Sequence, residues 1–137
     1  MARILVADDE PPMRMVIRHA CERAGHEVHE AIDAPTAVVA YERLKPDLLV
    51  IDIGMPGGGG RFVLNTLRFG GTKRIAPVLV VTGSMAGTVD EIRQALAVEA
   101  VILKPFRMVE LARVVQTLLG GPAKPGGPNP GAPPPTR

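Results

Sequence analysis

Three carboxylates, a hydroxyl and an ammonium stand directly at the ends of short apolar runs in this sequence. They belong to Asp8, Asp9, Asp52, Thr82 and Lys104. Three carboxylates that converge within ~4 Å repel one another by roughly 1 to 4 kcal/mol per pair. A shared proton or a bound hard cation relieves that repulsion. Because no His or Cys accompanies these oxygens, the donor set favours Mg²⁺ or Ca²⁺ over zinc.

The same side chains suit phosphoryl transfer. A carboxylate can attack phosphorus to form an acyl phosphate, and the transfer needs mainly alignment and neutralisation of the moving oxygens. Mg²⁺ would take one oxygen, the Lys104 ammonium a second, and the Thr82 hydroxyl with nearby N–H groups the third. Each residue also has an ordinary explanation, such as a helix cap at Asp9 or a loop residue at Asp8 or Asp52. Their joint occurrence after four separate apolar runs favours one site.

Strand and helix patterns alternate along the chain. Apolar runs, one of them weak, predict five strands, at residues 3–7, 27–31, 48–51, 78–81 and 100–103. Residues at helical spacing predict five helices, the second at 33–45, the third at about 61–69 and the fifth at 106–119. Five βα units imply an α/β fold, a doubly wound parallel sheet with helices on both faces. Such a sheet binds ligands at the carboxyl ends of its strands.

Local signals predict the helix ends. Asp9 could cap the first helix, whose first turn holds two prolines, and Gly25 stands where a helix C-terminal glycine is expected. Thr88 and Glu91 predict a capping box for the fourth helix. The inward stripe of the last helix is expected to be Met108, Leu111, Ala112, Val115 and Leu119.

The composition restricts the class of protein. With 137 residues and 46% hydrophobic residues, the chain has the size of one domain with its own core. Its single cysteine, Cys21, excludes an intrachain disulfide and is expected to be a buried hydrophobe in a reducing cytoplasm. The net charge of +2 is too small to indicate direct nucleic-acid binding. No run reaches the ~18 apolar residues of a membrane span, and no signal peptide is expected.

A change in composition divides the chain near its end. Residues 1–119 hold every predicted element and are expected to form one domain. Residues 120–137 are almost wholly Gly, Pro, Ala and Asn, with Lys124 and Arg137 as their only charges. Such a segment cannot bury enough apolar surface to offset its ordering entropy, so we expect an extended tail. A linker to a further domain and a proline-rich docking segment are the alternatives.

With these motifs in place, residues 1 to about 119 resemble the receiver domains of response regulators in two-component signalling. The matching motifs are Val6-Ala7-Asp8-Asp9-Glu10, Leu49-Val50-Ile51-Asp52-Ile53-Gly54-Met55-Pro56, Gly60, Thr82-Gly83 and Lys104-Pro105-Phe106. Their gaps of 43 residues (9 to 52), 30 (52 to 82) and 22 (82 to 104) are similar to those of the family. The resemblance implies a flavodoxin-like α/β fold with the strand order 2-1-3-4-5.

The resemblance implies a role for each residue of the site. Asp52 would accept the phosphoryl group, with Thr82 and Lys104 assisting, and the bond from Lys104 to Pro105 would be cis. Mg²⁺ or Mn²⁺ would be held by Asp8, Asp9, Asp52 and the carbonyl of Gly54. A sensor histidine kinase or a histidine phosphotransfer protein would supply the phosphoryl group. The domain, a signalling module rather than an enzyme, would then switch its binding to a downstream protein.

Some positions depart from the family's pattern. Val101 stands three residues before Lys104, where the family usually has a Tyr or Phe that acts as a rotamer switch. The glycine run 57–60 lacks the Gly-Lys-Ser/Thr ending of a P-loop, so we interpret it as flexibility beside the acceptor rather than as a phosphate cradle. Arg61 stands where an apolar residue is more usual. The histidines show no metal-ligand spacing and are expected on the solvated surface: His19, His26 and His29.

Three other interpretations fit part of the sequence. The chain could be the N-terminal receiver of a longer response regulator. A dehalogenase-like phosphatase also uses an Asp nucleophile with Mg²⁺, but its second acid would stand at position 10 rather than at Asp9, and no cap domain is present. A flavin-binding module of the same topology would need a Ser/Thr-rich phosphate loop after the first strand, where two acids stand instead.

Overall fold

The computed structural model describes residues 1–70, 74–83 and 87–120. Within them, five parallel strands form one sheet in the order β2-β1-β3-β4-β5, which confirms the expected topology. The strands are β1 (Arg3–Ala7), β2 (Glu27–Ala31), β3 (Leu48–Ile51), β4 (Val78–Thr82) and β5 (Ala100–Leu103). The helices are α1 (Pro11–Arg23), α2 (Ala34–Leu44), α3 (Gly59–Phe69), α4 (Val89–Leu96) and α5 (Met108–Gly120).

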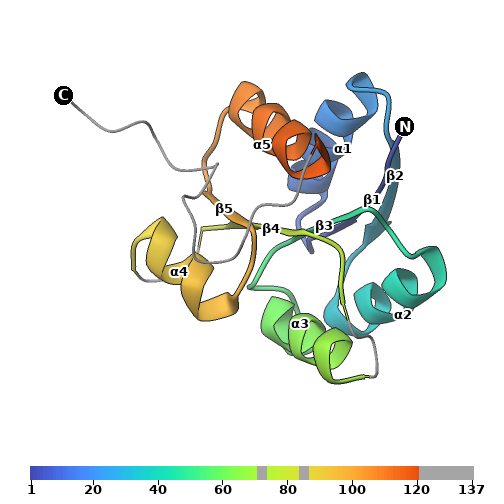
Figure 1. The fold of residues 1–137 in the computed structure, drawn as a ribbon, viewed down its shortest axis with the longest axis vertical. Helices are drawn as coiled ribbons and strands as arrows, with labels where there is room; N and C mark the ends of the chain where they lie inside the picture. Colours follow the sequence, from blue (N-terminus) through green and yellow to red (C-terminus); the bar gives the residue numbers. More distant parts are fainter. Residues whose placement is uncertain (71–73, 84–86, 121–137) are drawn as a thin grey trace.

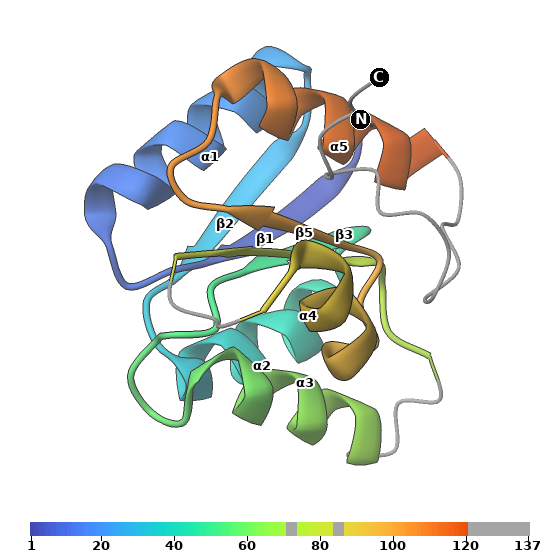
Figure 2. The same cartoon turned by 90° about the vertical axis from the view of Figure 1, so that its left-hand side faces the viewer.

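Helices cover both faces of the sheet (Figures 1 and 2). α1 and α5 lie on one face, and α2, α3 and α4 lie on the other. Successive strand residues point to opposite faces, so Ile4 and Val6 join the core under α1 and α5. Leu5 and Ala7 join the core on the other face. Both layers are therefore needed to bury a single strand such as β1.

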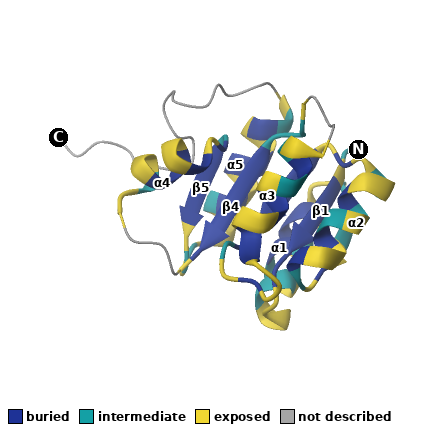
Figure 3. Ribbon diagram, turned by 90° about the horizontal axis from the view of Figure 1, so that it is seen from below, coloured by how far each residue is buried: buried dark blue, intermediate teal, exposed yellow. Residues whose placement is uncertain are grey.

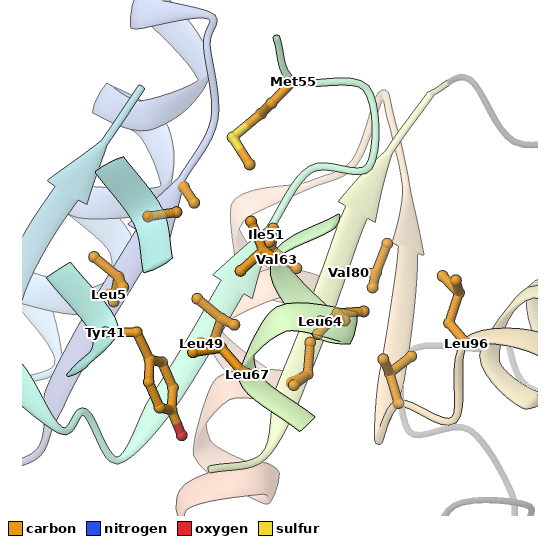
Figure 4. Packing of buried hydrophobic residues seen from close by; sticks show 14 of the residues in the cluster. Leu5, Tyr41, Leu49, Ile51, Met55, Val63, Leu64, Leu67, Val80 and Leu96 are labelled. Atoms are coloured by element: carbon orange, nitrogen blue, oxygen red, sulfur yellow. The ribbon is translucent and has the colours of Figure 1, made fainter. Parts of the chain in front are cut away.

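The core beneath α2, α3 and α4 is built largely from aliphatic side chains (Figure 4). Tyr41 of α2 lies among them with its ring buried, and its hydroxyl accepts a hydrogen bond from the Ala76 amide at 2.7 Å. A buried phenol without a partner would be costly. Tyr41 thus ties α2 to the segment that leads into β4.

The start of α1 differs from the prediction. The N-cap is Glu10 rather than Asp9, and its side chain makes no capping bond. Prolines occupy the first two helical positions, which removes two of the N–H groups that a cap would satisfy, and the Met13 amide bonds the Glu10 carbonyl at 3.1 Å. The carboxylate of Asp9 is therefore not used as a helix cap.

Two other end signals hold. Gly25 follows the α1 C-cap with φ at +90°, a conformation that favours glycine. Thr88 is the N-cap of α4, and its hydroxyl accepts from the Glu91 amide at 3.1 Å. Within the described residues the Glu91 side chain makes no reciprocal bond to the Thr88 amide, so only half of the predicted capping box is present. These short signals therefore predicted helix boundaries well where no proline competed.

The inward face of α5 was only partly predicted. Met108 and Ala112 are exposed, whereas the expected Leu111 and Val115 are buried and the expected Leu119 is half-buried against the same core. The remaining buried positions on the helix are Val114 and Leu118, and with Leu111 and Val115 they follow the spacing i, i+3, i+4, i+7. Packing explains the difference between the two stripes. The observed stripe buries four branched aliphatic side chains, whereas the predicted stripe would have placed a small alanine in the core.

Some other expectations concern single side chains. Cys21 is 1% exposed, as expected, and burial raises the pKa of its thiol to about 11. His19 is exposed and the side chain of His29 is 37% exposed, as expected, but the expectation was wrong for His26, which is half-buried. His26 Nδ1 accepts from the Ala2 amide at 3.0 Å, and His29 Nε2 lies 2.7 Å from Glu27 Oε2.

Among the described residues, none of the helices has the length and apolar character required to cross a bilayer. Of the predicted tail at residues 120–137, Gly120 is the last residue of α5, and 121–137 lie outside the described residues. The extent of the tail therefore stays a prediction.

Candidate functional site

The parallel ladder carries the predicted polar residues to one edge of the sheet. Ala7 pairs with Ile51, so β1 and β3 end side by side. The Asp52 amide then donates to the Ala7 carbonyl at 2.9 Å. At the other side of β4, the Lys104 amide donates to the Thr82 carbonyl, also at 2.9 Å. Backbone pairing alone thus brings residues from four strands together, although they are up to 96 positions apart.

The Lys104 ammonium joins the two buried acids of this edge. Its Nζ lies 3.0 Å from Asp8 Oδ2 and 3.3 Å from Asp52 Oδ2. Asp8 is 1% exposed and Asp52 is 6% exposed. Charges taken this far out of water need partners. The ammonium provides one that both carboxylates share.

Two further carboxylates complete an acidic cluster. The side chains of Asp8, Asp9, Glu10 and Asp52 can each offer one oxygen, and these oxygens lie within 4.8 Å of one another. Asp9 and Glu10 are exposed, which leaves the cluster open on one side. Glu10 Oε1 also lies 2.9 Å from Lys104 Nζ. Sequence reasoning gave Glu10 no role, although its position directly after the acidic pair was the available signal.

The electrostatics of the edge follow from burial and from this shared ammonium. Burial raises the pKa of the Asp8 carboxyl, and the hydrogen bonds from the Glu10 amide and from Lys104 oppose that shift without cancelling it. Burial alone would lower the pKa of Lys104, but its hydrogen bonds to Glu10 and Asp8 raise it overall. Lys104 therefore stays protonated at neutral pH. The carboxylates around it would repel a further anion.

The other predicted site residues have supporting positions. Thr82 is fully buried at the end of β4. The Gly54 amide donates to Asp52 Oδ1 at 3.1 Å, which orients the carboxylate while Lys104 holds its other oxygen. Metal ligation by the Gly54 carbonyl stays a prediction. The Lys104–Pro105 peptide bond is cis, as expected.

The glycine run beside Asp52 has a packing role that differs from the flexibility expected of it. Gly57, Gly58 and Gly59 have φ values of +84°, +109° and +71°. A Cβ at Gly59 would lie 2.3 Å from the Ile53 carbonyl oxygen, and one at Gly60 would lie 2.9 Å from that of Asp52. The glycines let α3 begin at Gly59, two residues earlier than expected. The start of the helix therefore packs directly against the backbone of Asp52 and Ile53.

Val101 stands at the position where receivers usually have an aromatic side chain. It lies in β5 with no exposed surface and belongs to the core cluster that also contains Ile92 and Leu96 of α4. Arg93 of α4 is 2% exposed. An aliphatic side chain in β5 and a buried arginine in α4 thus belong to two elements that pack against each other.

Comparison with known proteins identifies the family. Residues 4–116 match the family model of the response regulator receiver domain. The chain therefore belongs to the response regulator receiver family, whose members are signalling domains of two-component systems.

Two curated relatives illustrate the range of lengths. The chain is 35% identical over 116 residues to the transcriptional regulatory protein PdtaR of Mycobacterium tuberculosis, covering 83% of this chain and 55% of the relative. It is 32% identical over 126 residues to the chemotaxis protein CheY of Thermotoga maritima, covering 85% and 93%. The chain spans about half the length of the first of these relatives and nearly all of the second.

A solved structure agrees with the fold. The chemotaxis response regulator CheY4 of Vibrio cholerae superposes with a TM-score of 0.76 at 26% identity, covering 87% of this chain and 99% of that one.

Proposed function

We propose that this chain is a receiver that accepts a phosphoryl group on Asp52 from a phosphohistidine donor and then alters its binding to another protein. The observation that carries the proposal is the position of Lys104 Nζ between Asp8 Oδ2 and Asp52 Oδ2, at 3.0 and 3.3 Å. A cation held there can follow the negative charge from the carboxylates to an incoming phosphoryl group.

The donor set fits a hard divalent cation. The oxygens of the acidic cluster come from carboxylates, with no His or Cys ligand among them. The ion would be held by Asp8, Asp9 and Asp52 together with the Gly54 carbonyl. Mg²⁺ or Mn²⁺ bound there would neutralise part of the charge on the phosphoryl oxygens.

The residues at the carboxyl edge of the sheet have separate roles in the transfer of the phosphoryl group. A carboxylate oxygen of Asp52 forms the new O–P bond while the P–N bond of the donor breaks, and the electron pair of that bond returns to the imidazole nitrogen. The Lys104 ammonium then pairs with a phosphoryl oxygen in place of its present carboxylates, and the Thr82 hydroxyl takes another. The Gly54 amide keeps Asp52 oriented, because it holds Oδ1 at 3.1 Å.

The partners follow from this chemistry. The donor is a sensor histidine kinase or a histidine phosphotransfer protein in the cytoplasm, and the recipient of the signal is another protein. We propose residues 1–119 as the complete receiver, with 120–137 as a tail. An N-terminal receiver of a longer response regulator is the alternative, since the relatives include chains of both lengths. The reading frame beyond Arg137 distinguishes the two.

Incubation with a small acyl phosphate and Mg²⁺, followed by intact mass spectrometry, tests the proposal. The chain should gain the mass of one phosphoryl group, and chelation of the metal should prevent the gain. Asp52→Asn should show no gain, because the nucleophilic carboxylate is lost. Asp33→Asn is the matched control and should be labelled as the parent is, because Asp33 caps α2 through the Thr36 amide and lies outside the cluster.

Two results would reject the proposal. One is an unmodified parent chain under conditions in which the acyl phosphate survives. The other is undiminished labelling of Asp52→Asn. Steady turnover of a phosphomonoester by the parent chain would instead favour a phosphatase.

A further inference from the structure

The solvent-facing side of α3 carries two large aromatic side chains. Phe62 is 45% exposed and Phe69 is 86% exposed. They are two of the three phenylalanines in the whole chain. The outer side of α3 is coloured as exposed in Figure 3, and α3 lies at the boundary of the molecule in Figure 2.

The fold does not need these aromatic side chains. The inner side of α3 is complete with three buried aliphatic residues, Val63, Leu64 and Leu67. Phe69 in particular contributes almost none of its surface to the core. Single exposed apolar residues are ordinary, but two aromatic rings on one helix face are typical anchors of a binding surface.

The spacing of the anchors suits a helical partner. Phe62 and Phe69 are seven residues apart, which places them two turns apart on the same face, about 10.5 Å along the axis. Asn65 lies between them and is exposed. An amphipathic helix presents apolar anchors at this same repeat. We define the α3 outer face as Phe62, Asn65 and Phe69.

The charge that α3 contributes beside this face is positive, and the nearby carboxylate of Glu99 offsets part of the charge of Arg68. α3 contains Arg61 and Arg68 and no acidic residue. Arg68 is held in place because it donates to the carbonyls of Leu96 and Ala97 at 2.7 and 2.6 Å. A hollow of about 80 Å³ lies between α3 and α4, and the two arginines and Asn65 are part of its lining. This hollow has the size and charge to receive an acidic side chain that flanks an apolar anchor.

We propose that the α3 outer face is a docking surface for an acidic amphipathic helix of a partner protein. Its apolar anchors would cover Phe62 and Phe69, and its carboxylates would lie toward Arg61 and Arg68. A second copy of this chain is disfavoured as occupant, because the arginines beside the two identical faces would repel each other. Nucleic acid is disfavoured because only two arginines flank the face, which is not a basic cluster.

Titration of the ¹⁵N-labelled full chain with a synthetic peptide tests this proposal. The probe is an acidic helix of about 18 residues, with leucines in an i, i+3, i+7 pattern and glutamates on both flanks. We expect saturable NMR shifts that centre on α3. Phe69→Ser should weaken the affinity roughly tenfold, because an exposed aromatic anchor is removed. Asn65→Glu should weaken it as well, because it places on the face a negative charge that repels the glutamates of the peptide.

Matched controls distinguish specific binding at the α3 outer face from non-specific binding of the peptide. Val109→Ser on α5 removes another exposed apolar side chain, 76% exposed, and should leave the affinity unchanged. A peptide with lysine in place of every glutamate should not bind. Phe69 lies outside the packed core, so its variant is expected to fold, which the amide spectrum would report directly.

Several outcomes would overturn the proposal. These are the absence of saturable binding, shifts centred away from α3, or equal binding of the lysine peptide. Saturation of the same residues by a single-stranded RNA oligonucleotide alone would assign the face to nucleic acid. A dimer of the free chain that is lost in Phe69→Ser would assign it to a second copy. None of these outcomes depends on phosphorylation of Asp52.

Discussion

Two regions treat buried charge in opposite ways: helix α4 and the carboxyl edge of the sheet around Asp52, called the acceptor edge because we propose Asp52 as the acceptor. At the acceptor edge, the buried carboxylates of Asp8 and Asp52 share one ammonium, and both also accept backbone N–H groups. Under α4, the Nε and Nη1 groups of the buried Arg93 have no hydrogen-bond partner among the described residues. Its nearest acid is the exposed Asp90, 3.6 Å from Nη2.

This contrast teaches where the chain is closest to its family and where it departs. Buried charges that are paired and hydrogen-bonded keep their geometry. Their shared cation can also change its anionic partner, as phosphoryl transfer requires. A buried guanidinium with two unbonded N–H groups and a single ion pair to an exposed acid carries a desolvation cost that this pair only partly offsets. The neighbouring β5 has Val101 instead of the expected aromatic. The edge around Asp52 therefore keeps the residues expected of a receiver, whereas α4 and β5 depart from that expectation.

The largest effect should follow from removing the shared ammonium. Lys104→Met leaves the carboxylates of Asp8 and Asp52 facing each other without a cation. We expect a loss of about 3 kcal/mol in the free energy of unfolding, measured by urea denaturation at neutral pH. Added Mg²⁺ should restore part of it, and Arg43→Met on the exposed side of α2 should change little. A variant as stable as the parent without metal would contradict the view that this edge is held by compensation.

Gly59→Ala should lower the stability nearly as much, because the backbone that follows Asp52 leaves no room for a side chain at Gly59. The new Cβ would lie 2.3 Å from the Ile53 carbonyl oxygen at a residue with φ of +71°. We expect a loss of at least about 2 kcal/mol by urea denaturation. Gly25→Ala is the control for backbone strain alone, since Gly25 has φ of +90° but no atom within 4 Å of the added Cβ. Equal losses in the two variants would show that the close approach at Gly59 is unimportant.

Arg93→Met should have a smaller effect of the opposite sign. The change removes a desolvated guanidinium and keeps an apolar side chain of similar length in its place. We expect the free energy of unfolding to rise by about 1 kcal/mol. Arg113→Met removes an exposed arginine from α5 and should leave stability nearly unchanged. A clear loss of stability in Arg93→Met would mean that the guanidinium is compensated after all, and the contrast between the two regions would fail.

The smallest effect concerns Glu99, which precedes β5 and accepts the Val78 amide at 2.7 Å. Burial raises the pKa of this carboxyl, and its hydrogen bond to Val78 only partly offsets the shift. Because the pKa is higher in the folded state, the contribution of Glu99 to stability is complete in acid and is lost as pH rises through the folded pKa. Glu99→Gln keeps the acceptor oxygen and cannot ionise. Its stability relative to the parent should therefore improve slightly between pH 4 and pH 7, and a constant difference would argue against the shift.

Much of the fold could be predicted because its signals are local. The apolar runs that became β1, β3 and β5 are bounded as expected, since a strand buried on both faces needs an unbroken apolar run. Strand order followed from the βα alternation and the resemblance to receivers. The α5 stripe was misjudged because two overlapping apolar stripes exist on that helix, and only packing against α1 and the sheet selects between them.

The candidate site shows the same division. The types and spacing of Asp8, Asp52 and Lys104 in the sequence determined that a cation and an acidic pocket would meet at the carboxyl edge. Only the tertiary structure decided that one ammonium lies between both buried acids, that Glu10 joins it, and that the glycines beside Asp52 are required by close contact. Those features depend on distances between atoms from separate strands and loops, and a linear pattern carries no such distances.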